Sequence, residues 1–166
     1  SVVIERGGEM IGLIGLVPQD TAEGSKPGEN VIFTDPVEAV QTQVDLLKEQ
    51  GVNKIIVLSH SGYGVDLNLA KQTTDVDVIV GGHSHTYLSS EDPTASGPYP
   101  TIIGDTAIVQ AFAYGKYLGR LEVVFDNAGK LVAANGSPLL LDAKVAEAEE
   151  IKSRIIEAAV PLEKVR

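Results

Sequence analysis

Two short apolar runs in the sequence each lead directly into histidine. Ile55–Leu58 is followed by Ser59-His60-Ser61-Gly62, and Val76–Val80 is followed by Gly81-Gly82-His83-Ser84-His85. The first run is continuously apolar and the second is interrupted only by Asp77, a pattern typical of parallel strands that are buried on both faces. Ligands of open α/β sheets bind beyond the carboxyl ends of the strands. Topology alone therefore predicts a site at the histidines.

Segments that favour helices alternate with these strands. Asp35-Pro36-Val37-Glu38 predicts a helix start, because Asp is a good N-cap and Pro suits the first helical position. Apolar residues then recur on one helical face, and Gly51 marks the end. These apolar residues are Val37, Val40, Val44 and Leu47. A shorter helix is expected over Asp66–Gln72, so a helix precedes each strand, as in a parallel sheet.

The remaining segments predict a mixed α/β chain. Two runs joined at Gly7-Gly8 predict a hairpin, and Pro18–Thr34 reads as a surface loop. A second loop over Thr86–Pro100 precedes short strands that should form hairpins or a meander. These short strands are Thr101–Ile103, Ile108–Ala111, Leu118–Phe125 and Leu131–Ala133. Helical spacing returns over Lys144–Val160 and is stopped by Pro161.

Composition limits the partners of the chain. Its 166 residues suit one folding unit with a hydrophobic core. The formal charge is −10, from 13 Lys+Arg against 23 Asp+Glu, which disfavours nucleic acid and anionic membrane surfaces as binding partners. An anionic substrate would need metal ions to offset its charge. Cysteine is absent, so thiolate chemistry is excluded. No apolar stretch is long enough for direct membrane insertion.

All three histidines of the chain, His60, His83 and His85, lie in Gly/Ser-flanked loops directly after predicted strands. Neutral imidazole suits zinc, manganese and similar ions, and the neighbouring glycines leave room for a metal to approach. Each histidine taken alone is compatible with an ordinary loop residue, and a lone His-x-His is weak evidence. The three together favour metal ligation.

Other polar and aromatic residues near these loops have more ordinary interpretations. Asp66, Asp77 and Asp105 could orient a ligating imidazole, but capping or solvated roles are expected for each. Phe112, Tyr114 and Tyr117 could line a pocket, but their spacing favours core packing in a strand. The Gly-rich segments match neither a P-loop nor a dinucleotide fingerprint.

The two histidine motifs resemble the last two motifs of the calcineurin-like metallophosphoesterases. Asn53–Leu58 and Gln110–Gly119 are similar to the 5'-nucleotidase branch, and the resemblance covers nearly the whole chain. It implies a four-layer fold of two mixed β-sheets flanked by helices. It also implies two divalent metal ions (zinc, manganese or similar), with His60 and His83 ligating one ion and His85 the other.

By the same resemblance the chain is part of a metal-dependent phosphoric monoester hydrolase that converts 5'-nucleotides to nucleosides and phosphate. The family's Asp-x-His, Gly-Asp and Gly-Asn-His motifs are not found here, so no catalytic residue is assigned to this chain. Residues 1–143 are interpreted as the C-terminal half of the metallophosphoesterase domain. Residues 144–166 are interpreted as a helix leading toward a C-terminal substrate-binding domain.

The interpretation as half a domain carries further expectations. The N-terminal half and the substrate-binding domain of the same protein would be partners, and the chain alone should bind metal poorly and hydrolyse nothing. The resemblance also implies an extracytoplasmic location (periplasmic, secreted or cell-surface). A UDP-sugar hydrolase, a 2',3'-cyclic-nucleotide phosphodiesterase and a non-catalytic module that retains the fold remain alternatives.

Overall fold

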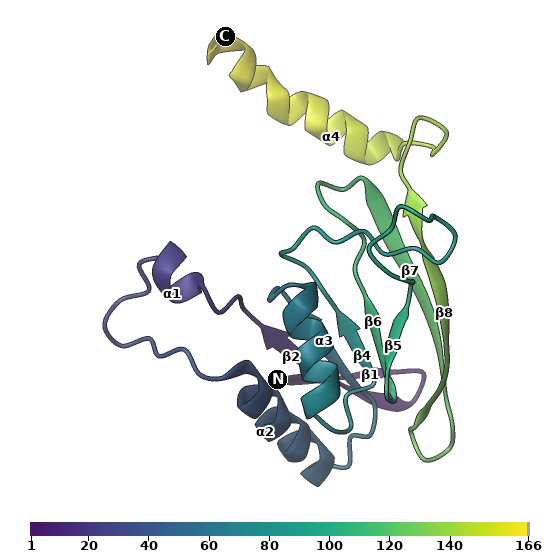
Figure 1. The fold of residues 1–166 in the computed structure, drawn as a ribbon. Helices are drawn as coiled ribbons and strands as arrows, with labels where there is room; N and C mark the ends of the chain where they lie inside the picture. The colour runs from purple at the N-terminus through teal and green to yellow at the C-terminus, as the bar shows by residue number, and fades with distance from the viewer. Residues whose placement is uncertain (166) are drawn as a thin grey trace.

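The structure is a computed structural model that describes residues 1–165 and, of these, the side chains of residues 1–162. Within this part of the chain, six strands form one sheet and two long strands form a separate hairpin (Figure 1). The strands are β1 (Val2–Arg6), β2 (Glu9–Leu16), β3 (Ile55–Ser59), β4 (Val78–Val80), β5 (Thr101–Ile103), β6 (Thr106–Val109), β7 (Tyr117–Phe125) and β8 (Leu131–Leu140). The helices are α1 (Thr21–Gly24), α2 (Pro36–Glu49), α3 (Tyr63–Gln72), α4 (Glu149–Ala159) and the 3-10 helix η1 (Val160–Val165).

The main sheet has the order β1-β2-β3-β4-β6-β5. Its four central strands β2, β3, β4 and β6 are parallel, whereas β1 and β5 pair antiparallel at the two edges. The carboxyl ends of the four parallel strands therefore meet along one edge of the sheet. The predicted mixed α/β class, the N-terminal hairpin and the parallel pairing of the two histidine-bearing strands are confirmed.

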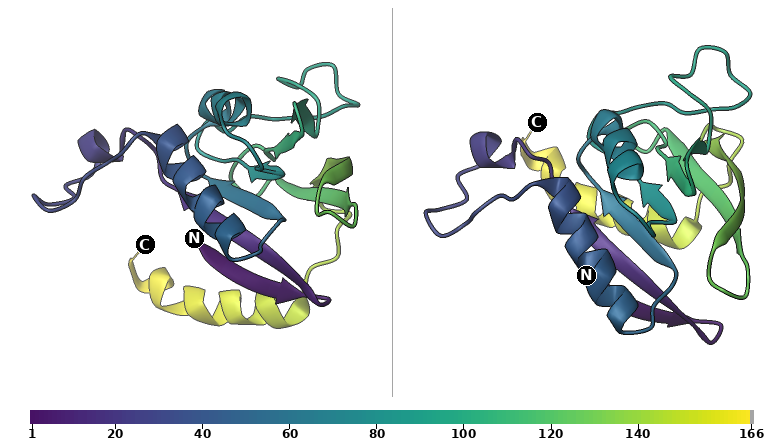
Figure 2. Two further views of the ribbon diagram at one scale, coloured as in Figure 1. Left: turned by 90° about the horizontal axis from the view of Figure 1, so that it is seen from below. Right: turned by 60° about the horizontal axis from the view of Figure 1, so that its bottom comes forward.

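Two helices cover one face of the main sheet. Asp35 caps α2 by accepting hydrogen bonds from the backbone amides of Val37 (2.8 Å) and Glu38 (3.1 Å), as predicted. The apolar face of α2 contacts β2, and α3 lies beside α2 against β5 and β6, as Figure 2 shows. The core between helices and sheet consists of these buried residues: Ile14, Val40, Val44, Leu47, Val52, Ile55, Val57, Leu69, Ala70, Val76, Ile79 and Ile108.

The opposite face of the main sheet is only partly covered. Leu58 of β3 and Val80 of β4 are paired neighbours and are 48% and 40% exposed. The prediction that both strands are buried on both faces is therefore wrong for this face. Alternation along a strand turns these two side chains away from the helices, so the helical layer cannot bury them.

Several element boundaries differ from the predictions; β6, for example, spans Thr106–Val109 and not Ile108–Ala111. The loop expected over Pro18–Thr34 contains the short helix α1. Strand β8 runs to Leu140, well beyond Ala133, because the segment that contains Gly136 and Pro138 pairs with β7. Pro138, which has no backbone N–H, is tolerated because β8 is an edge strand of this two-stranded sheet. Helix α3 begins at Tyr63, earlier than the expected Asp66.

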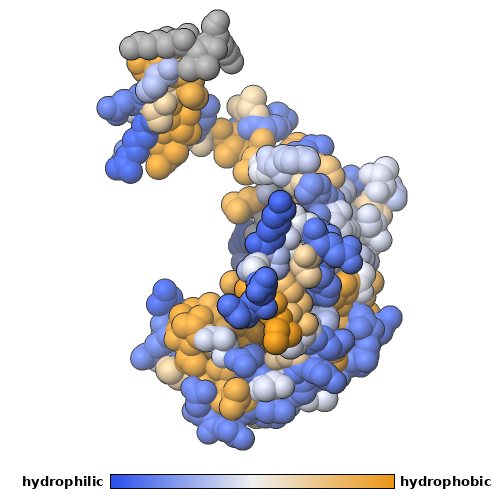
Figure 3. Space-filling view, turned by 90° about the vertical axis from the view of Figure 1, so that its left-hand side faces the viewer, coloured by the Kyte–Doolittle hydropathy of each residue, from blue (hydrophilic) through white to orange (hydrophobic). Residues whose placement is uncertain are grey.

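Helix α4 leaves the body of the molecule. It begins at Glu149, later than the expected Lys144. Every side chain of Glu149–Ala159 is exposed, including those of Ile151, Ile155 and Ile156. Figure 3 shows apolar surface on this helix and a hollow between it and the body. Among residues 1–165, no helix has both the length and the apolarity to cross a bilayer.

Candidate metal centre

The carboxyl ends of the parallel strands bring residues from distant parts of the sequence together. His60 follows β3, and its backbone amide donates to the carbonyl of Leu16 at the end of β2 (2.9 Å). Gly81 follows β4, and its amide donates to the carbonyl of Val109 at the end of β6 (2.8 Å). The strands and these two bonds fix the loops that carry the histidines.

His60 and His83 face each other at this edge. Their ring centroids are 5.3 Å apart with an interplanar angle of 73°, and both residues are exposed. Nε2 of His83 lies 3.8 Å from a carboxylate oxygen of Asp20, in the loop after β2. His83 therefore lies beside both the His60 ring and the Asp20 carboxylate, at the edge where strand topology predicted a site.

His85 points elsewhere. Its ring makes an edge contact with Tyr114, with ring centroids 5.0 Å apart. The structure thus brings two of the three predicted ligands together and holds the third against an aromatic ring.

The backbone of the second histidine loop is unusual. His83 (φ 69°) and His85 (φ 52°) both adopt the left-handed conformation, which is uncommon for residues with a side chain. Such conformations persist where surrounding contacts hold them, and they gather at binding and catalytic sites. Gly82 keeps the neighbouring space open, since a methyl group there would lie 2.9 Å from Nδ1 of His60.

Asp66 lies beneath this loop, on the first turn of α3. Its side chain is fully buried, and within the described residues neither carboxylate oxygen has a hydrogen-bond partner of ordinary geometry. Burial raises the pKa of Asp66 above its usual value, and the nearby Ser59 hydroxyl opposes this rise. A methyl group at Gly81 would collide with an oxygen of Asp66. The expected solvated or capping role is therefore wrong for Asp66.

Asp77 and Asp105 lie at the other end of the sheet, away from the histidines. Asp77 accepts a hydrogen bond from the Ile55 amide (2.7 Å), and burial raises its pKa to about 6. Asp105 forms an exposed ion pair with Lys130 (3.0 Å). Both aspartates border a cavity of about 510 Å³. The structure thus supports their ordinary structural roles and gives neither a contact with a histidine.

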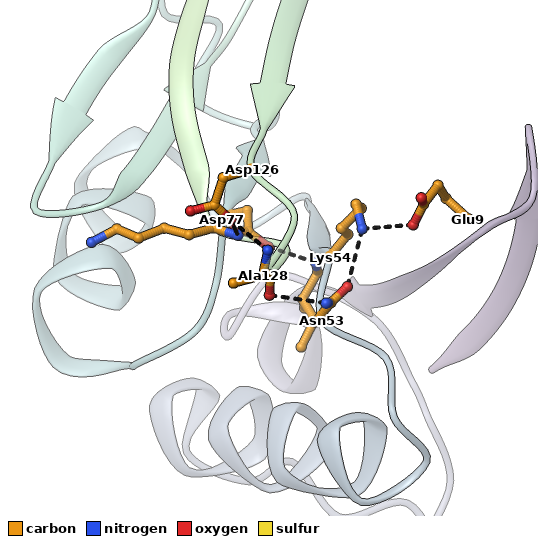
Figure 4. Close-up of polar contacts among 8 residues, drawn as sticks. Glu9, Asn53, Lys54, Asp77, Asp126 and Ala128 are labelled. Carbon is orange, nitrogen blue, oxygen red and sulfur yellow. Dashed lines mark hydrogen bonds and ion pairs between the residues drawn. The ribbon is translucent and has the colours of Figure 1, made fainter.

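This end of the sheet is also where the β7–β8 hairpin joins the main sheet (Figure 4). Nδ2 of Asn53 donates to the carbonyl of Ala128 in the hairpin turn (3.0 Å). The ammonium group of Lys54 bonds Glu9 (2.8 Å) and the side-chain oxygen of Asn53 (3.1 Å). The turn itself is closed by Asp126, which accepts from the Ala128 and Lys130 amides.

The aromatic residues after β6 do not pack in the core as expected. Tyr114 is 91% exposed and Phe112 is 38% exposed, and both have positive φ angles (58° and 62°). The segment turns between β6 and β7 and is no strand, so the assumed alternation does not apply. Tyr117, at the start of β7, stacks on Tyr87 with ring centroids 4.8 Å apart.

The donors present fit a divalent cation only in part. Imidazole nitrogen and carboxylate oxygen are both ligands that zinc and manganese accept. However, residues 1–165 contain no group of three His, Cys, Asp or Glu side chains arranged to hold one ion. Within the described residues, His60 and His83 therefore do not form a complete metal site by themselves.

Sequence reasoning missed two residues of this edge, Asp20 and Gln110. Asp20 lies in the segment predicted as a surface loop, and no single residue of that loop was selected, although the loop follows a parallel strand. Gln110 directly follows β6 and was used only for its resemblance to the family, although a polar residue at a strand end carried the same topological signal as the histidines.

Known proteins share both the sequence and the fold of this chain. The 5'-nucleotidases of Mus musculus and Homo sapiens are each 40% identical to it over 98% and 92% of its length. The chain spans about 30% of the length of these curated relatives. A 5'-nucleotidase precursor from Thermus thermophilus matches 98% of the chain and 34% of its own chain, with 44% identity and a TM-score of 0.91. No protein-family model matches the chain.

The fold is that of the calcineurin-like phosphoesterases. The Bacillus subtilis phosphoesterase YfkN matches with a TM-score of 0.76 at 23% identity, which shows a common fold. Within this class, the chain is a homologue of one segment of the 5'-nucleotidases, with identities near 40%. The resemblance drawn from the histidine motifs is confirmed.

Proposed function

We propose that the chain is part of a dinuclear-metal phosphohydrolase that hydrolyses 5'-nucleotides to nucleosides and phosphate, and that His60, His83 and His85 are its contribution to metal binding. One observation carries the proposal. Two histidines from loops after neighbouring parallel strands face each other at 5.3 Å in a chain that is a homologue of 5'-nucleotidases.

The protein's own residues prepare this edge for an anionic substrate in three ways. The His60 and His83 rings lie beside each other, and Gly82 leaves the space next to Nδ1 of His60 free of side-chain atoms. The exposure of both histidines leaves the edge open to a substrate. Divalent ions bound there would offset the charge of phosphate oxygens and lower the pKa of an attacking water.

We further propose that additional polypeptide completes the site. The structure offers fewer than three grouped ligands among its described residues, and Leu58 and Val80 leave apolar surface open on the second face of the main sheet. A second sheet against that face would bury this surface and place further ligands at the same edge. Residues 1–143 would then be half of a metallophosphoesterase domain, and residues 144–166 would lead to a substrate-binding domain. An extracytoplasmic location is part of this proposal.

Hydrolysis assays on the complete protein test the proposal. We expect phosphate release from AMP with Mn²⁺ or Zn²⁺, loss of activity with a chelator, and recovery when metal is restored. UDP-glucose and 2',3'-cyclic AMP as parallel substrates would distinguish the related hydrolases. A folded complete protein that hydrolyses none of these substrates with either metal, with AMP followed by phosphate release and the other two by their nucleotide products, would contradict the proposal and favour a non-catalytic module.

A further inference from the structure

Gln110 contacts the second histidine loop at every other residue. Its side-chain nitrogen donates to the carbonyl of Gly82 (2.9 Å). Its side-chain oxygen accepts from the Ser84 hydroxyl (3.1 Å) and from the Thr86 backbone amide. One amide side chain therefore binds three alternate residues and leaves His83 and His85, which lie between them, free to project.

The surroundings of Gln110 make it a fixed support. Gln110 is 2% exposed and directly follows strand β6. Backbone bonds secure the loop on either side, from the Gly81 amide to the Val109 carbonyl (2.8 Å) and from the Phe112 amide to the Thr86 carbonyl (3.0 Å). Gln110 therefore binds the loop residues that lie between these two backbone hydrogen bonds.

Ser84 extends the same support to the first histidine loop. Its hydroxyl oxygen accepts a hydrogen bond from the Tyr63 amide at the start of α3 (3.0 Å) while the hydroxyl proton is donated to Gln110. Tyr63 lies three residues after His60, so the two histidine loops are linked through Ser84. A disturbance at Gln110 would reach both loops.

The left-handed conformations of His83 and His85 need such support. Residues with side chains rarely adopt positive φ, and they keep it where the surrounding contacts over-determine the backbone. The three bonds from Gln110 fall on the residues immediately before, between and after the two histidines. Removing them would let both histidines relax toward ordinary backbone conformations and turn their rings.

We propose that Gln110 is a positioning residue that sets the directions of His83 and His85 toward bound cations. This proposal rests on the proposed function, because it assumes that these histidines are ligands. Outer residues that hold metal ligands typically change metal affinity or activity by about 10–100-fold when they are substituted. Gln110 acts through the loop backbone.

Cobalt binding to the complete, metal-free protein tests this role, because the visible absorption of Co²⁺ reports ligand number and geometry. Gln110→Met keeps the side-chain length and removes all three bonds. Gln110→Glu keeps the acceptor for Thr86 and removes the donor to Gly82. Gln41→Met is the control, since Gln41 also accepts from a backbone amide, that of Thr74 (2.9 Å), but lies on α2.

We expect Gln110→Met to weaken Co²⁺ binding by about 10–100-fold and to change the absorption spectrum. Gln110→Glu should weaken Co²⁺ binding less. If Gln110→Met does not fold, the result for Gln110→Glu tests the positioning role. Gln41→Met should bind Co²⁺ with the wild-type spectrum. Wild-type affinity and spectrum in the folded Gln110 variants would overturn the positioning role.

His83→Asn and His85→Asn separate this result from a failure of the proposed function. Suppose that either histidine substitution abolishes Co²⁺ binding at the site of that histidine while the Gln110 variants behave as wild type. In that case only the positioning role is overturned. If both histidine variants bind Co²⁺ as the wild type does, the proposed function fails and the positioning role fails with it.

Discussion

At the amino-terminal end of the main sheet, buried Asp77 accepts a hydrogen bond from the Ile55 amide, whereas at the carboxyl end buried Asp66 accepts none of ordinary geometry within the described residues. The first end also has Asn53 and Lys54 bound to neighbouring elements. The second has exposed histidines in left-handed conformations.

The difference separates stability from function along a single sheet. At the amino-terminal end, polar groups are paired with each other, which holds the hairpin and the strands together. At the carboxyl end, the histidine rings are exposed, and His83 and His85 retain backbone conformations that cost about 1–3 kcal/mol each. Substitutions of the exposed histidines at the carboxyl end should therefore affect activity with little change in the free energy of unfolding. Substitutions of the paired polar groups at the other end should affect mainly the free energy of unfolding.

The largest expected effect is on activity at the carboxyl end. His83→Asn in the complete protein should lower the rate of AMP hydrolysis by about 100-fold or more, because it removes a proposed metal ligand. Circular dichroism and the unfolding midpoint should stay near wild type, since His83 is exposed. Asp105→Asn, which alters an exposed carboxylate at the other end, is the matched control. Equal loss of activity in both variants would erase the contrast between the two ends.

A pH-dependent effect on stability is expected at the amino-terminal end. The folded-state pKa of Asp77, about 6, exceeds its ordinary value of 3.8, so folding favours its protonated form. The resulting stability is present below pH 4 and is lost as the pH rises through 6. Relative to wild type, Asp77→Asn should therefore gain up to about 3 kcal/mol between pH 4 and 7.

Urea unfolding of wild type and Asp77→Asn across this pH range measures the difference directly. Asparagine can still accept from the Ile55 amide, so the comparison isolates the charge of the carboxylate. A difference in unfolding free energy that stays constant from pH 4 to 7 would show that Asp77 has an ordinary pKa.

A smaller effect is expected beneath the histidine loop. In Gly81→Ala the added methyl group would lie 3.0 Å from Nε2 of Gln110 and closer still to Asp66. Both neighbours are buried, so we expect a loss of about 2 kcal/mol in the free energy of unfolding. Gly15→Ala is the control, because a methyl group there meets nothing within 4 Å. Similar unfolding midpoints for the two variants would mean that the loop yields easily.

The smallest effect is expected where the hairpin joins the sheet. Asn53→Ala removes the bond to the Ala128 carbonyl and should cost about 1 kcal/mol. Gln50→Ala removes an exposed bond to the Leu46 carbonyl within α2 and should cost less. Hydrogen exchange of the hairpin turn amides should rise in Asn53→Ala alone. Unchanged exchange there would show that other contacts secure the hairpin.

Much of the main sheet was predictable because local rules and tertiary packing agree there. The Asp35 cap, the apolar face of α2 and the Gly7-Gly8 turn all appear where their residues predict them. The extent of β8 was not predictable, since Gly136 and Pro138 are ordinary strand breakers, and only pairing with β7 makes their segment extended.

The site was predictable in position but not in detail. Strand topology placed the histidines at one edge, yet no local pattern shows that His60 faces His83 while His85 contacts Tyr114. The burial of Asp66 depends on how α3 packs under the Gly81 loop, which is a tertiary property. The family was predicted from the motifs that the chain shares with it, whereas the hydrogen bonds from Gln110 to the histidine loop are seen only in the three-dimensional structure.

Anomalous diffraction from crystals of the complete protein soaked in Mn²⁺ tests directly whether the histidines at the carboxyl edge of the main sheet bind metal. We expect anomalous peaks at the carboxyl edge of the main sheet, one within coordinating distance of His60 and His83 and another beside His85. Peaks found only near Asp77 and Asp105, or no peak at the histidines at saturating Mn²⁺, would contradict it.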